Sequence, residues 1–332
     1  MTERLLLAAD IGGTGTRLAL VESARGSDTF LAQEDFLNAD FPSLTPIVQA
    51  FLDRHQATPT AACLCVAGPV LAGRARLTNL PWTLDQRQLA DELGIGSVIL
   101  LNDLQAIAYA VPHLRPQDTE PLNAGTAVAN GPIAVIAPGT GLGESFLIWD
   151  GQRYQACASE GGHTDFGPVN DQQAGLLAFM SRRVGRVSYE RVCAGSGLPN
   201  VYEYLRTQFP AQDTEALAAS LVEVEDRTPL IIAAALAGPQ PDPVALAAVS
   251  MMIDIWAAEA GNLALKTLST GGVYLAGGMP MRVGSALNRE RFMQVFSDKG
   301  RFSGLLRSMP VHRVLVNAGL LGAARFGLQS LD

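Results

Sequence analysis

The sequence has few cysteines and no dense run of basic residues. Four cysteines in 332 residues are too few for a disulfide-rich scaffold, and no two of them have the C-x-x-C spacing of a zinc site. Cys63 and Cys65 would share one face of a strand, as small buried apolar residues. The net charge is −8, and a nucleic-acid binder usually carries a basic patch instead. We therefore expect neither nucleic acid nor a membrane surface as a partner.

Long hydrophobic runs are also missing. The longest uncharged apolar stretches, residues 230–237 and 244–253, are far below the ~18–20 residues of a membrane span. They predict buried, alanine-rich helices. The first residues precede only a short apolar run that ends at Asp10, which is unlike a signal peptide, so we expect a cytoplasmic protein. At roughly 100–200 residues per domain, the length predicts two domains.

Predicted strands and helices are mixed throughout the chain. Apolar runs with β character are bounded by glycine, proline or polar residues, whereas the helical segments show an apolar stripe. This mixture predicts an α/β fold. The expected strands are residues 5–9, 18–21, 61–67, 98–101, 133–137, 273–276 and 311–316, and the expected helices are residues 46–54, 84–93, 104–111, 174–183, 230–237, 244–268 and a last one near Gly319.

A turn of glycine and threonine follows the first strand, at residues 12–16. It lacks the third glycine of a dinucleotide fingerprint and the Gly-Lys-Ser/Thr of a Walker A loop. What remains is a tight hairpin whose backbone N–H groups and threonine hydroxyls can face phosphate oxygens. Asp10, at the strand end, is a candidate magnesium ligand, and a carboxylate that caps the turn is the alternative.

This strand–turn–strand unit occurs twice. Residues 5–23 align without gaps on residues 133–151, so that Gly13 matches Gly141 and Gly15 matches Gly143. Two related phosphate-type hairpins indicate two domains with similar cores. Asp10 aligns with Pro138, so only the first turn can supply a carboxylate to a metal.

Two further groups of polar residues are candidates for a site. Asn102 and Asp103 end an apolar strand, where active-site carboxylates often stand, but both are also good N-cap residues for the next helix. Glu160 and His163 flank a glycine pair, and Glu190 follows downstream. A lone histidine is usually structural, yet these three together offer the convergent donors and acceptors that a sugar needs.

These motifs resemble, in their order along the chain, the bacterial ATP-dependent glucokinase family of the actin, sugar kinase and chaperone ATPase superfamily. Each motif is weak alone, but the ordered set is specific, and the similarity spans residues 5–327. The motifs are residues 10–17 (DIGGTGTR), 101–103 (LND), 139–143 (GTGLG), 160–166 (EGGHTDF), 190–192 (ERV) and 276–278 (AGG).

The resemblance implies an α/β fold with two domains of the actin-like, ribonuclease H-like type. The small domain would comprise residues 1–108 and 312–332, and the large domain residues 109–311, with sugar and ATP in the cleft between them. The protein would phosphorylate D-glucose at its 6-hydroxyl. The sequence leaves a homodimer open.

The resemblance also implies a role for each motif residue. Asp103 would be the catalytic base and would bind glucose together with Asn102, Glu160, His163 and Glu190. Asp10 would serve Mg²⁺. The phosphates of ATP would lie on Asp10, Gly12, Gly13, Thr14, Gly139, Thr140 and Gly141, and its adenosine on Gly277 and Gly278.

Some features depart from the family pattern or leave rival functions open. Gly15 stands where the family commonly has asparagine, and Pro138 replaces a small residue before the second turn. No cysteine-rich motif follows His163, so we expect no structural zinc. The rivals are a kinase for mannose or an amino sugar, a sugar-sensing regulator on the same fold, and an actin-type scaffold, which would lack the Glu160, His163 and Glu190 set.

Overall fold

The computed structural model describes residues 4–25, 29–77, 80–209, 215–222 and 224–330. Contacts divide the chain into two compact units. Unit 1 comprises Met1–Arg115, Tyr154–Ala158 and Val316–Asp332, and unit 2 comprises Pro116–Arg153 and Ser159–Leu315.

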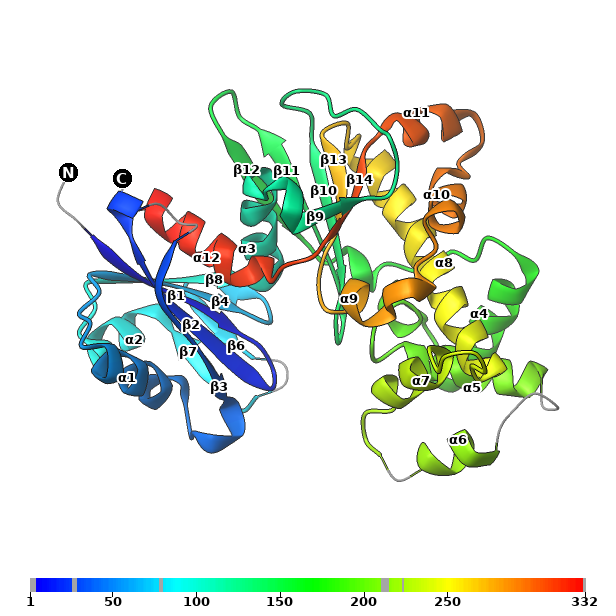
Figure 1. Cartoon of the computed structure of the whole chain (residues 1–332), viewed down its shortest axis with the longest axis horizontal. Coiled ribbons are helices and arrows are strands. Elements are labelled where there is room, and N and C mark those ends of the chain that lie inside the picture. Colours follow the sequence, from blue (N-terminus) through cyan, green and yellow to red (C-terminus); the bar gives the residue numbers. More distant parts are fainter. Residues whose placement is uncertain (1–3, 26–28, 78–79, 210–214, 223, 331–332) are drawn as a thin grey trace. The chain divides into compact units, whose positions relative to one another are not determined.

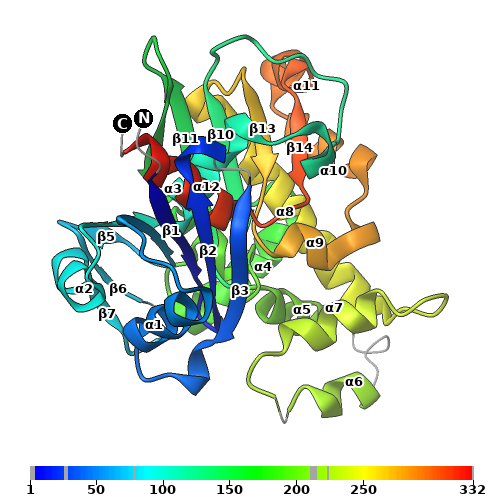
Figure 2. The same cartoon turned by 60° about the vertical axis from the view of Figure 1, so that its left-hand side comes forward.

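Unit 1 is built on a five-stranded sheet with the order β3-β2-β1-β4-β8 (Figure 1). β4 and β8 run parallel to β1, whereas β2 and β3 form an antiparallel meander at the edge, which Figure 2 shows from the side of β3. A small sheet with the order β5-β6-β7 adjoins it. The strands are β1 (Leu5–Ile11), β2 (Gly15–Glu22), β3 (Phe30–Leu37), β4 (Ala61–Val66), β5 (Val70–Leu71), β6 (Arg74–Arg76), β7 (Thr83–Asp85) and β8 (Ser97–Asn102).

Helices cover both faces of this sheet. The helices are α1 (Leu44–His55), α2 (Gln86–Leu93), α3 (Asp103–Ala110) and α12 (Ala318–Gln329). Leu7 and Ala9 of β1 pack in the core that includes residues of α1 and α2, and Leu6 and Ala8 pack in the core that includes residues of α3 and α12. A strand buried on both faces needs apolar residues at every position, which explains the unbroken run at the start of the chain.

Unit 2 contains most of a six-stranded mixed sheet with the order β12-β11-β10-β13-β14-β9, of which β12 is an edge strand. β10 pairs antiparallel with β11 and parallel with β13. The strands are β9 (Thr119–Pro121), β10 (Ile133–Pro138), β11 (Leu142–Trp149), β12 (Tyr154–Ser159), β13 (Gly272–Leu275) and β14 (Val311–Val314). The helices are α4 (Asp171–Val184), α5 (Leu198–Gln208), α6 (Glu215–Ser220), α7 (Thr228–Ala235), α8 (Pro243–Thr267), α9 (Met279–Val283), α10 (Arg289–Ser297) and α11 (Ser303–Ser308).

Helix α8 forms the centre of the unit 2 core. Its 25 residues are long and apolar enough to cross a membrane by length and composition, which the shorter uncharged runs did not indicate. However, 78% of its most apolar window is buried inside the protein, and Trp256 packs edge-on against Phe292 of α10. This is the burial of a core helix.

Most predicted elements are confirmed within a few residues, including the long helix α8 and the strand β4 that buries Cys63 and Cys65. The strand β3, the small sheet of β5 to β7, the edge strands β9 and β12 and the helices α5, α6, α9, α10 and α11 were not predicted. β3 alternates between half-buried and exposed positions, but its sequence FLAQEDFL lacks a clean alternation of apolar and polar residues, so the period-2 signal is weak.

Candidate functional site

The first glycine turn joins β1 to β2 in unit 1. Ile11 pairs with Thr16, so residues 12–15 form the turn, and Gly12 N–H donates to the Gly15 carbonyl at 2.9 Å. The buried Asn38 holds this turn in place. Its amide donates to the Gly12 carbonyl at 2.9 Å, its side-chain oxygen accepts from Thr16 Oγ1 at 2.7 Å, and its backbone N–H donates to the Thr14 carbonyl at 3.0 Å. No sequence motif marks Asn38, because it follows the strand that was not predicted.

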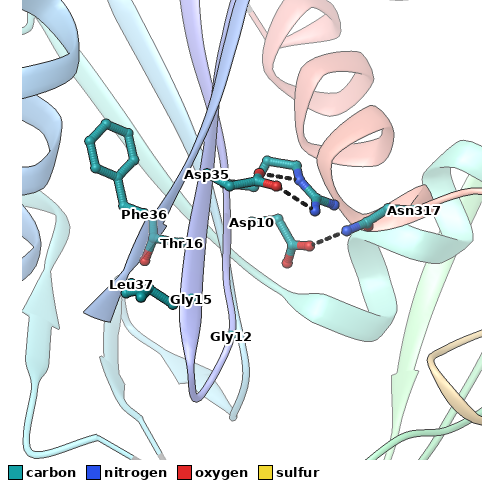
Figure 3. Close-up of a pocket in the computed structure, with 9 residues that line it drawn as sticks. Asp10, Gly12, Gly15, Thr16, Asp35, Phe36, Leu37 and Asn317 are labelled. Atoms are coloured by element: carbon teal, nitrogen blue, oxygen red, sulfur yellow. Dashed lines mark hydrogen bonds and ion pairs between the residues drawn. The ribbon is translucent and has the colours of Figure 1, made fainter. Parts of the chain in front are cut away.

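Asp10 lies against the start of α12 (Figure 3). Its Oδ2 accepts a hydrogen bond of 3.0 Å from Asn317 Nδ2, and Asn317 is the N-cap of that helix. A Cβ on Gly319 would come within 3.2 Å of the Asp10 carboxyl carbon, so a glycine there lets the helix end approach closely. A helix N-terminus favours negative charge, which suits both this carboxylate and a phosphate nearby.

A cavity of about 320 Å³ opens beside Asp10 within unit 1. Arg17, the cross-strand partner of Asp10, forms a two-pronged ion pair with Asp35 on β3, at 2.5 and 3.0 Å. This hydrogen bonding lowers the pKa of Asp35 below its ordinary value. Arg17 is therefore bonded to Asp35, and the two hydrogen bonds that Asp10 accepts come from neutral groups, the Asn317 amide and, at 3.7 Å, the Cys65 thiol. The cavity is lined by Asp10, Gly12, Gly15, Thr16, Arg17, Asp35, Phe36, Leu37 and Asn317 (Figure 3).

The second glycine turn joins β10 to β11 in unit 2. Pro138 pairs with Leu142, and Gly139 N–H donates to the Gly141 carbonyl at 2.8 Å. A backbone segment supports it from behind, because Gly195 N–H and Ser196 N–H donate to the carbonyls of residues 139 and 140 at 2.8 and 3.1 Å. None of these supporting residues was singled out in the sequence.

The two glycines predicted for adenosine lie close to the second turn. Gly277 has φ +83°, and a Cβ there would meet the Pro138 carbonyl at 2.9 Å, so only glycine fits without strain. A Cβ on Gly278 would point into open space. The chain can thus approach a ligand closely at this position.

The gap-free alignment of the two hairpins is wrong in its register, because strand pairing shifts the first strand by one residue and the second strand by two. Residues 12–15 close the first hairpin, whereas residues 139–141 close the second, so one residue is missing from the second turn. Strand pairing matches Ile11 to Pro138 and therefore Asp10 to Ala137. The inference that only the first turn carries a carboxylate at this place survives the correction.

Asn102 and Asp103 stand where β8 passes into α3. The sequence left open which of them caps the helix. Asn102 is the N-cap of α3. Its Oδ1 accepts from Leu104 N and Gln105 N at 3.0 and 3.3 Å, and its Nδ2 donates to the Gly68 carbonyl and to Asp103 Oδ1, both at 3.0 Å. Asp103 is the first residue of the helix and not its cap.

The environment of Asp103 tunes its acidity. Burial raises the pKa of its carboxyl group to about 6, and the nearby charge of Asp10 acts in the same direction. The hydrogen bonds from Leu104 N–H and Asn102 oppose this shift. A carboxylate with a pKa close to neutral is a more effective proton acceptor than an ordinary aspartate.

Glu160, His163 and Glu190 come together in unit 2. His163 Nε2 lies 3.9 Å from Glu160 Oε2, and His163 Nδ1 lies 3.9 Å from Glu190 Oε1. The other oxygen of Glu190 accepts from Leu142 N–H at 3.0 Å, which ties it to the second glycine turn. A cavity of about 240 Å³ beside them is lined by His163, Ser188, Glu190, Arg191, Ser196 and Asn200.

The candidate residues thus fall into two groups, one in each unit. Unit 1 holds Asp10, Gly12, Gly13, Thr14, Asn102 and Asp103, and unit 2 holds Gly139, Thr140, Gly141, Glu160, His163, Glu190, Gly277 and Gly278. The structure brings the members of the sugar-type cluster within reach of one another, and it joins that cluster to the second turn through Glu190.

Comparison with known proteins agrees with the motif order. A family model described as Glucokinase matches residues 7–330. The glucokinase of Nostoc sp. is 41% identical over 336 aligned residues, which cover 96% of this chain and 98% of that protein.

Solved structures show the same likeness. The glucokinase from an Antarctic psychrotroph matches with a TM-score of 0.81 at 33% identity, covering 97% of this chain and 98% of that one. The glucokinase of Balamuthia mandrillaris, solved in complex with glucose, has a TM-score of 0.78 at 24% identity, covers 97% of this chain and 93% of its own, and shows the shared fold. The chain therefore belongs to the glucokinase family of ATP-dependent hexose kinases, as its motifs predicted.

Proposed function

We propose that Asp103 accepts the proton of the glucose 6-hydroxyl while the two glycine turns hold the phosphates of ATP. The observation that carries this proposal is that Asn102, and not Asp103, is the N-cap of α3 at the end of β8. The Asp103 carboxyl is only a second acceptor for Leu104 N–H, and burial raises the pKa of Asp103 to about 6.

The phosphates would bind to backbone N–H groups of the two turns, with the Thr14 and Thr140 hydroxyls as further donors. Phosphoryl transfer depends mostly on positioning and on neutralising charge. The segment around Gly277 and Gly278 would lie against the adenosine, because the missing side chains leave room there.

Asp10 would hold Mg²⁺ together with phosphate oxygens and water. The residues fit this group, because the Asp10 oxygen is bonded to the neutral Asn317 amide and not to a competing cation. Within the residues that the structure describes, no three His, Cys, Asp or Glu side chains gather as a metal cluster. A single carboxylate with substrate phosphates is the usual magnesium arrangement. The ion would neutralise charge on the phosphates.

Glu160, His163 and Glu190 would bind the hydroxyls at the anomeric end of glucose. Glu190 has one oxygen fixed by Leu142 N–H, which leaves the oxygen near His163 as an acceptor for a hydroxyl. Asn102 would contact the sugar by exchanging its bond to Asp103 for one to a hydroxyl, since its amide already donates twice.

We further propose the actin-like arrangement of two domains, residues 1–108 with 312–332 and residues 109–311, with substrates in the cleft between them. The contact-defined units, which divide after Arg115 and after Leu315, support it. Closure over the sugar would exclude water, a competing phosphate acceptor. We place the enzyme in the cytoplasm and leave a homodimer open.

The Asp103→Asn variant tests the central assignment. Asn102 still caps α3, so the variant should fold and bind glucose, but kcat at saturating substrates should fall on the order of 10²–10⁴-fold. In the wild type, kcat should decline below about pH 6 as Asp103 becomes protonated, and the variant should lack this limb. A kcat within about threefold of wild type would be too small a loss for a general base and would remove Asp103 from the mechanism.

A further inference from the structure

A buried acid lies directly beneath the loop that carries Glu160 and His163. Glu144 is the third residue of β11, two positions after Leu142, and it is 1% exposed. It takes no part in the proposed chemistry. A fully buried carboxyl group with no catalytic task needs a physical explanation, since burying such a group is costly.

The glycine pair of the loop lies in contact with the start of β11. A Cβ on Gly161 would fall 1.9 Å from Glu144 Oε2 and 2.6 Å from its carboxyl carbon. A Cβ on Gly162 would fall 2.0 Å from the Leu142 carbonyl oxygen. Only residues without a side chain can approach so closely. The Glu144 carboxyl group and the Leu142 carbonyl therefore lie directly against the glycine pair of the loop.

The charges around Glu144 leave it without a cation. Glu259 of α8, itself 0% exposed, accepts from Lys266 Nζ at 3.2 Å and from Asn262 Nδ2 at 2.8 Å. Lys299 is bonded to the Ala258 carbonyl and to Asn262 Oδ1. Lys266 thus pairs with Glu259.

Glu144 Oε1 has no hydrogen-bond partner among the residues that the structure describes. The pKa of Glu144 is raised to about 8, chiefly by burial. The negative charge of Glu259 also raises this pKa, and the positive charge of Lys266 lowers it by less. The protonated form of Glu144 is consequently favoured at neutral pH. Tyr189 and Cys193 also interact with Glu259. Burial raises the pKa of both groups, so both stay neutral at neutral pH.

We propose that Glu144 is a positioning residue for glucose binding, whose neutral carboxyl group supports Gly161 and so directs Glu160 and His163 toward the sugar. This inference rests on the proposed sugar-binding role of those two residues. When Glu144 loses its proton, a buried charge without a partner must draw in water or move away from Glu259, and the glycine pair moves with it.

The predicted signature is a rise in the KM for glucose at alkaline pH. The charged and titratable groups that lie against the loop and Glu144 are Glu259, Lys266, Lys299, Tyr189, Cys193, Glu160, His163 and Glu190, together with Arg186, which donates to the His163 carbonyl, and its ion-pair partner Asp165. Between pH 7 and 9.5 the KM for glucose should rise, with its midpoint near the pKa of Glu144, about 8. The KM for ATP should stay within about twofold, because the loop does not hold the phosphates.

Two substitutions separate the charge of Glu144 from its shape. Glu144→Gln keeps the size and the neutral state, so the KM for glucose at pH 7 should stay within about threefold and should no longer rise with pH. Glu144→Ala removes the support, and a misplaced site should raise the KM for glucose on the order of 10-fold while that for ATP barely moves. Ser145→Ala, the buried neighbour on β11, controls for disturbed packing of the strand and should leave the KM for glucose unchanged.

Several outcomes would overturn the proposal. These are an equal rise with Gln and Ala at pH 7, an alkaline limb that persists in Glu144→Gln, and parallel rises for both substrates in Glu144→Ala. His163→Ala distinguishes this failure from failure of the sugar site. If that variant keeps a normal KM for glucose, the sugar-site assignment is wrong and the positioning role falls with it. If His163→Ala raises the KM but Glu144→Ala does not, only the positioning role is wrong.

Discussion

At the scale of single residues, Asn102 and Asp103 show how adjacent polar side chains can serve different ends. Asn102 is the N-cap of α3, whereas Asp103 is half-buried in the first turn of the same helix and accepts a further bond from Leu104 N–H. A carboxylate held in a buried place costs stability, and active sites commonly keep such groups. The two neighbours can therefore be tested separately.

Replacing Asp103 by asparagine should stabilise the protein at neutral pH. Folding raises the pKa of Asp103 to about 6, so the folded protein holds this proton more tightly than the unfolded chain. The contribution of Asp103 to stability is therefore complete below its ordinary pKa and is lost as the pH rises through about 6. Neutral asparagine avoids that loss and can still accept from Leu104 N–H. Above pH 6 the variant should gain on the order of 1–3 kcal/mol in unfolding free energy.

Denaturant unfolding at pH 4 and pH 8 measures this difference. The two proteins should have nearly equal stability at pH 4, and the variant should be the more stable at pH 8. A variant that is less stable at both pH values would mean that the Asp103 carboxylate is held by favourable bonds that outweigh its burial.

At the scale of elements, each glycine turn depends on a neighbouring segment that is distant in sequence. Asn38, just after β3, binds the first turn at three places, and residues 195 and 196 pair with the second turn. Glycine lets both turns come close to a ligand, but it also leaves the backbone conformationally free. The supporting bonds restrict that freedom, so the N–H groups of the turns keep one direction.

Asn38→Ala should weaken nucleotide use more than sugar use. The change removes the bonds of the side chain to Gly12 and Thr16 and leaves polar groups unpaired, at a cost of about 1–3 kcal/mol. The KM for ATP should rise several-fold, while the KM for glucose should stay within about twofold.

Asn123→Ala provides a matched control for that experiment. Asn123 makes a similar set of bonds, to the backbone of residues 307, 309 and 311, in unit 2. It should lower the melting temperature comparably without a selective effect on ATP. If both variants change the two KM values alike, Asn38 acts through general stability and not through the turn.

At the scale of the whole molecule, we expect the sugar specificity to follow from the proposed hydroxyl-binding groups, which are Glu160, His163 and Glu190 in unit 2 and Asn102 in unit 1. Glucose should have the highest kcat/KM in a coupled assay across hexoses. Mannose and glucosamine each differ from glucose at one ring position, and each should leave one polar group of the site poorly paired, with a loss of at least about tenfold in kcat/KM. Faster turnover of another hexose would contradict this ranking and leave the fold assignment intact.

Much of the fold could be predicted because its signals are local. The runs that became β4 and β10, and β1 up to Asp10, are apolar since both faces of their strands are buried, and α2 ends before Gly94, whose φ of +65° suits glycine. Strand β3 was not predicted, because an edge strand with half-exposed positions lacks a continuous apolar run. The catalytic candidates were recognisable as motifs, but the residues that hold them in place were not.

The sequence by itself determined most of the core strands and helices, the two glycine turns and the family, since the signals for each of these lie in contiguous residues. Only the tertiary structure decided which neighbour supports each part of the site. Asn38 reaches Gly12 across 26 residues, Glu190 reaches Leu142 across 48, and Asn317 reaches Asp10 across 307. The same holds for the buried carboxyl of Glu144 beneath Gly161 and for the shorter second turn. Such contacts depend on how the elements pack and on strand register, and no local pattern encodes them.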